Sequence, residues 1–95
     1  MTIFAITSVN VDTTLDDTNF TVLVDASGGN RIINLPTAIG IAGTVYNIKK
    51  TDSSINTVTI DGNGAQTIDG KITKIITTQY ENVTIQSDGA NWVIL

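Results

Sequence analysis

The sequence has no cysteine and no histidine, only one proline, and only five cationic side chains among its 95 residues. Without cysteine, the chain can form neither a disulfide nor a thiolate metal site. Without histidine, it lacks the commonest general base and the commonest metal ligand. These absences disfavour enzymatic chemistry, and we predict a protein that is not an enzyme.

Charge is sparse, with nine acidic and five basic residues and a net charge of −4. The cations do not cluster beyond pairs, so no basic patch for nucleic acid or anionic lipid is present. No apolar run is long enough to span a bilayer. Residues 1–6 lack the basic start and the cleavage-like end of a signal peptide. We therefore expect no nucleic-acid partner, no membrane, and synthesis in a cytoplasm without a targeting signal.

Hydrophobic residues alternate with polar ones along most of the chain, as in half-buried strands. In residues 18–25, Phe20, Val22 and Val24 share one face, and a Gly-rich loop then leads to a second apolar stretch at 31–35. We predict that these two strands form a hairpin. The other predicted strands are residues 2–11, 44–50, 55–61, 66–68 and 71–78 and the pair in 80–95.

About eight or nine short strands with regularly spaced turns predict an all-β fold, an antiparallel β-sandwich in particular. Jelly-roll connectivity and other antiparallel arrangements both remain open. A chain of 95 residues makes a single domain. Small β domains without disulfides or metals often gain missing burial by oligomerising.

The last sixteen residues, 80–95, read as a β-hairpin around the turn Ser87–Asn91. The final strand is apolar at every position, with Trp92 on one face and Val93 and Leu95 on the other. We therefore expect this strand to lie centrally, with Trp92 in the core and Val93 and Leu95 against a second copy of the chain. Tyr80 has the opposite parity from the core positions of its strand and is a candidate surface or interface aromatic.

Residues 1–17 are expected to differ in role from the β-sandwich domain of residues 18–95. Ile3 and Phe4 do not fit one face of a regular strand. The segment can be an edge strand or an arm that docks on a partner, and an acidic linker or turn at 12–17 follows it. We predict Ile3 and Phe4 as contact residues of this possible attachment segment.

Candidate catalytic and ligand-binding motifs have simpler structural explanations. Asp61 begins a calcium-loop-like DGNG, but no glutamate follows at the spacing of an EF-hand. Glu81 has no aspartate partner that the sequence singles out for glycoside hydrolysis. Trp92, Tyr80 and Tyr46 could form a sugar-stacking platform, but aromatic residues in β proteins more often fill the core. We predict no catalytic, cofactor-binding or metal-binding residues.

Five segments occur in one order: NLP (34–36), GTVYNIKKTDSS (43–54), VTID (58–61), QTIDG (66–70) and QYENVTIQSDGANW (79–92). Together they resemble a small β-rich module of bacteriophage virion proteins, chiefly tail fibres and head fibres. The resemblance covers roughly residues 18–95 and leaves 1–17 outside. It implies a non-enzymatic, trimeric component displayed on the virion.

Our leading hypothesis is a capsid decoration or head-fibre-type subunit that forms a homotrimer and binds the capsid or another virion protein. The alternative is a receptor-binding module of a tail fibre that recognises a host surface glycan. The second hypothesis predicts an exposed aromatic, such as Tyr80, surrounded by Asn and Asp.

Overall fold

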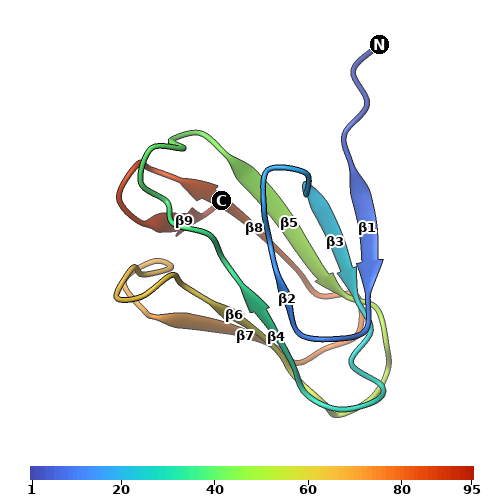
Figure 1. Ribbon diagram of the computed structural model, residues 1–95. Coiled ribbons are helices and arrows are strands. Elements are labelled where there is room, and N and C mark those ends of the chain that lie inside the picture. The colour runs from blue at the N-terminus through green and yellow to red at the C-terminus, as the bar shows by residue number, and fades with distance from the viewer.

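The computed structural model describes residues 1–95 as nine strands in two sheets, which confirms the all-β prediction (Figure 1). It contains no helix that is long and apolar enough to cross a membrane. The strands are β1 (Ile6–Val9), β2 (Thr13–Thr14), β3 (Thr21–Val24), β4 (Arg31–Asn34), β5 (Val45–Lys50), β6 (Val58–Asp61), β7 (Thr73–Ile76), β8 (Asn82–Ser87) and β9 (Trp92–Ile94).

The first six strands alternate between the two sheets, so the chain winds as a flattened spiral. β1, β3 and β5 lie side by side in a five-stranded sheet of order β1-β3-β5-β8-β9. β2, β4 and β6 do the same in a four-stranded sheet of order β2-β4-β6-β7. Neighbours within each set run parallel, because every return to a sheet passes through the other sheet.

The predicted antiparallel pairing is found in only three of the seven strand pairs: β5 with β8, β6 with β7, and β8 with β9. The predicted hairpin of residues 18–25 and 31–35 is wrong, since β3 and β4 belong to different sheets. The backbone of Ala26 explains this, because its N–H donates to Asp52 Oδ1 (2.7 Å) and its C=O accepts from Asn56 Nδ2 (2.8 Å). These bonds hold the chain where it crosses from the five-stranded sheet to the four-stranded sheet. Jelly-roll connectivity is not confirmed.

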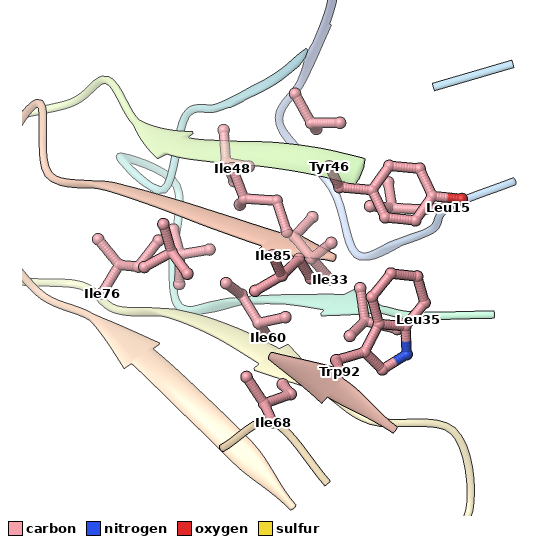
Figure 2. Close-up of a cluster of buried hydrophobic side chains, with 14 of the residues drawn as sticks. Leu15, Ile33, Leu35, Tyr46, Ile48, Ile60, Ile68, Ile76, Ile85 and Trp92 are labelled. Carbon is pink, nitrogen blue, oxygen red and sulfur yellow. The ribbon is translucent and has the colours of Figure 1, made fainter. Parts of the chain in front are cut away.

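The core lies between the sheets and contains sixteen buried hydrophobic residues. Its aromatic centre is Tyr46 and Trp92, whose ring centroids are 5.5 Å apart (Figure 2). The Tyr46 hydroxyl donates to the backbone oxygen of Asp16 at 2.9 Å, which satisfies the polar end of this buried side chain. Leu15 is also buried. Thus residues 1–17 contribute β1, β2 and a core side chain to the folded unit.

The C-terminal hairpin forms as predicted from β8 and β9, and Gly89 in its turn has φ 96°. Trp92 is 1% exposed, in agreement with its predicted core position. The predicted central position of the last strand is wrong, because β9 is the end strand of its sheet. Its free edge is covered by residues 67–69: Trp92 N–H donates to Thr67 O (2.8 Å), and Asp69 N–H donates to Trp92 O (3.0 Å). The predicted strand 66–68 forms only isolated bridges, so the spiral closes here without a tenth strand.

A buried ion pair joins the loop after β5 to the preceding turn of the spiral. Lys50 is fully buried, and its ammonium donates to Asp52 Oδ2 (3.0 Å), Asp52 O (3.0 Å) and Ser54 O (2.9 Å). All three ammonium protons can therefore be satisfied. The same Asp52 carboxylate accepts from Ala26 N–H and from the Ser54 hydroxyl. The pair thus anchors the crossing between sheets described above.

Candidate interaction face

The five-stranded sheet has a face that points away from the core and is continuous across its strands. Buried residues alternate with half-buried or exposed ones along β3, β5 and β8, so the intervening side chains point outward. The pairing register places the outward side chains of β1 in line with those of β3, and those of β9 in line with those of β8. We call this surface the outer face; it comprises Ile6, Ser8, Thr21, Leu23, Val45, Asn47, Lys49, Asn82, Thr84, Gln86, Val93 and Leu95.

A ladder of hydroxyl and amide groups crosses the centre of the outer face. Thr84 Oγ1 donates to Asn47 Oδ1 at 2.7 Å, and Asn47 Nδ2 donates to Thr21 Oγ1 at 3.4 Å. Asn82 Nδ2 adds a bond to Thr84 Oγ1 at 3.2 Å. Because these polar groups already bond one another, a partner can cover them with a smaller desolvation cost than for unpaired groups. Lys49 is the one charged side chain among the residues of the outer face.

Apolar side chains flank the ladder toward one end of the outer face, and we call this part of the surface the apolar end. Leu95 and Ile6 lie at opposite edges of the row through Thr84, Asn47 and Thr21, and they are 68% and 67% exposed. Val93 lies in the next row, paired with Gln86. The structure therefore brings the predicted contact residues Val93 and Leu95 onto one surface.

The N-terminal arm, residues 1–5, extends from this end of the molecule (Figure 1). Ile3 is exposed, whereas the Phe4 ring stacks on Phe20 with 4.6 Å between centroids. Phe4 therefore attaches the arm to the start of β3 while 62% of its own surface stays exposed. The predicted contact residues Ile3 and Phe4 thus lie in the arm next to the apolar end, with Phe4 held against Phe20.

The opposite end of the outer face carries Tyr80. Its side chain is 63% exposed, and its backbone has φ 68° in the left-handed region. Tyr80 N–H donates to Lys50 O at 2.7 Å, and Lys49 Nζ lies 5.8 Å from the ring centroid.

An open cavity of about 500 Å³ lies beside the ends of β1, β3 and β5; it is lined by Ser8, Val9, Asn10, Leu23, Asp25 and Thr51.

Asp25 provides the carboxylate of that cavity. Hydrogen bonds from the Ser27 side chain and backbone hold the pKa of Asp25 below its usual value, although partial desolvation acts in the opposite direction. Asp25 is therefore ionised at neutral pH and accepts hydrogen bonds. Glu81, the other acid considered above, accepts the N–H groups of Thr77 and Thr78 and so stabilises its own turn. No group of three or more potential metal-binding residues is present.

β1 presents an open strand edge next to the apolar end. The carbonyl groups of Ala5 and Val9 accept hydrogen bonds from Thr21 and Asp25 of the neighbouring strand. In parallel pairing the alternate residues, Ile6 and Ser8, direct their N–H and C=O groups away from that neighbour. Residues 1–11 contain no charged side chain, so the usual protection of an edge strand by charge is missing.

No protein-family model matches the chain, and no curated protein matches it.

Proposed function

We propose that this protein is a non-enzymatic structural subunit of a bacteriophage virion, of the capsid decoration or head-fibre type. In this proposal three copies associate through the apolar end of the outer face. The arm and the open edge of β1 attach the trimer to the capsid or to another virion protein.

The observation that carries the proposal is the combination of exposed apolar side chains with an internally bonded, nearly uncharged ladder. Full burial of a Val, Leu, Ile or Phe side chain contributes about 1.5–3 kcal/mol relative to leaving it in water. Ile6, Val93 and Leu95 together offer several kcal/mol per subunit, part of which must offset the entropy lost on association. The ladder between them adds contact area without unpaired charge.

The resemblance to phage fibre modules supports placing such a subunit on a virion. A displayed trimer gains further from contacts with several capsid subunits at once, because each additional contact is effectively intramolecular. An open strand edge suits this attachment, since a strand from the partner can complete its hydrogen bonds.

The edge of β1 gives a paired test of the attachment step. Ser8→Pro removes an N–H that is directed outward, whereas Thr7→Pro removes an N–H that is directed to β3. We expect Ser8→Pro to keep its fold but to co-sediment at least about tenfold less with phage heads assembled without the protein, a loss of about 1.4 kcal/mol. Thr7→Pro should lower the unfolding temperature instead. If Ser8→Pro sediments with heads as the unmodified protein does, the open edge is not the attachment site.

A further inference from the structure

Tyr80 occupies a backbone conformation that its side chain disfavours. A non-glycine residue in the left-handed region costs about 1–2 kcal/mol, and glycine or asparagine is the usual occupant. Tyr80 has φ 68° and is 63% exposed, and its cation–π contact with Lys49 contributes at most about 1 kcal/mol, so burial and packing do not offset this cost. A strained, solvent-facing aromatic is therefore explained better by a ligand than by folding stability.

The backbone of Tyr80 lies next to the strand end that forms the cavity wall. The Tyr80 N–H bond to Lys50 O sets residue 80 opposite the end of β5, next to Thr51 of the cavity wall. Gln79 Nε2 reinforces this position by donating to Thr51 O at 3.2 Å. Tyr80 thus extends the row of Thr51, Asp25 and Asn10 across the sheet.

The cavity wall carries the donors and acceptors that hydroxyl groups need. Asn10 has an amide that donates and accepts, Asp25 is an ionised acceptor, and Ser8 and Thr51 each carry a hydroxyl. Val9 and Leu23 are the two apolar residues of the lining. The cavity lining contains the Asp25 carboxylate and no cation, because Lys49 lies against the Tyr80 ring and not in the wall. An anionic ligand in the cavity is therefore disfavoured.

We propose that the cavity and the Tyr80 ring form a binding site for a neutral hexose unit of a polysaccharide. The apolar face of the sugar packs on the Tyr80 ring, and vicinal hydroxyls donate to the Asp25 carboxylate while Asn10 bonds a third oxygen. A concave site with one aromatic surface and a few convergent polar groups suits such a ligand. The open shape of the cavity leaves room for the chain to continue on both sides of the bound unit.

This site does not depend on the proposed assembly. Thr51 lies four residues beyond Asn47 of the apolar end, about 13 Å along the strand. A trimer contact at Leu95 and a sugar at Tyr80 can therefore be occupied together, and one can fail without the other.

Titration of the full chain with neutral gluco-, manno- and galacto-oligosaccharides, followed by amide chemical shifts, tests the site. We expect millimolar or tighter binding of at least one series, with shifts centred on Thr51 and Tyr80. Tyr80→Phe should retain binding, and Asp25→Asn should weaken it at least about tenfold.

Tyr80→Gly separates binding from folding. Because glycine tolerates a positive φ, this variant should unfold at a higher temperature than the unmodified protein and yet lose saccharide binding at least about tenfold. The proposal is overturned if no neutral series binds at millimolar concentration, or if Tyr80→Gly binds as well as the unmodified protein.

Discussion

Replacing Lys50 with methionine should lower the free energy of unfolding by about 3 kcal/mol, since removal of one partner from a buried ion pair costs about 3–5 kcal/mol. Methionine fills a similar volume but leaves the Asp52 carboxylate, whose side chain is 7% exposed, without its counter-ion. It also removes the donors to the backbone oxygens of Asp52 and Ser54. Urea unfolding at neutral pH measures the difference.

The neighbouring residue Lys49 provides a matched control. The Lys49 side chain points to the opposite face of β5, and its Nζ lies 5.8 Å from the centroid of the Tyr80 ring. We expect Lys49→Met to cost less than about 1 kcal/mol, the range of exposed cation–π contacts. Adding Asp52→Asn to Lys50→Met should recover part of the loss, because the uncompensated charge is removed. Equal costs for Lys49→Met and Lys50→Met would contradict the role of the buried pair.

The same ion pair makes the free energy of unfolding depend on pH. Desolvation raises the pKa of Asp52, but hydrogen bonds from Ser54, Ala26 and Lys50 outweigh it and hold the pKa far below the ordinary value of 3.8. A carboxyl group whose pKa is lower in the folded state stabilises the fold above its unfolded pKa, and this stabilisation is lost as pH falls toward the folded pKa. The ionisation part of the difference between the unmodified protein and Lys50→Met should therefore shrink below about pH 4.

Gly62→Ala should lower the free energy of unfolding by about 3 kcal/mol, at the upper end of the cost of overpacking. A Cβ atom at residue 62 would lie 2.3 Å from the backbone oxygen of Gln66. Backbone hydrogen bonds hold both residues of this clash in place. Gly62 N–H donates to Ile72 O at 2.9 Å, and Gln66 N–H donates to Asn63 O at 2.9 Å. The backbone must therefore shift where the spiral closes. Thermal and urea unfolding measure the loss.

Gly40→Ala is the control for this substitution. Gly40 has φ 82° but no heavy atom within 4 Å of an added Cβ. Its cost should therefore be only the conformational penalty of about 1–2 kcal/mol. If Gly62→Ala proves milder than Gly40→Ala, the close packing at Gly62 is not a constraint on the fold.

Most strand positions could be predicted from the sequence, whereas the strand partners could not. The exceptions are β2, which lies in the predicted linker, and the predicted strand 66–68, which forms only isolated bridges. Alternation with period two is the same in parallel and antiparallel strands, so it located residues 44–50 and 80–95 but did not distinguish a spiral from a hairpin. The residues that direct the chain across the sheets, Asp52 and Asn56, act on Ala26 from far along the sequence. No local pattern reveals such contacts.

The candidate face was partly predictable for a similar reason. Parity in the last hairpin identified Val93 and Leu95, and the opposite parity of Tyr80 marked it as a surface aromatic. The ladder of Thr21, Asn47 and Thr84 joins three separate strands and appears only when their register is known. Lys50 shares the parity of Tyr46 and Ile48, a signal that it points inward. Parity alone is not decisive for a charged residue, because a lysine is almost never fully buried unless it is paired, and the pairing with Asp52 is seen only in the structure.

The central proposal, self-assembly through the apolar end of the outer face, is tested most directly by the molar mass of the protein in solution. Light scattering during size-exclusion chromatography at micromolar concentration should give three times the chain mass of 10.1 kDa. Leu95→Lys, which places a charge on the exposed apolar end without touching the core, should give the mass of one chain. A single-chain mass for the unmodified protein, or a trimer that Leu95→Lys leaves intact, would contradict the proposed assembly.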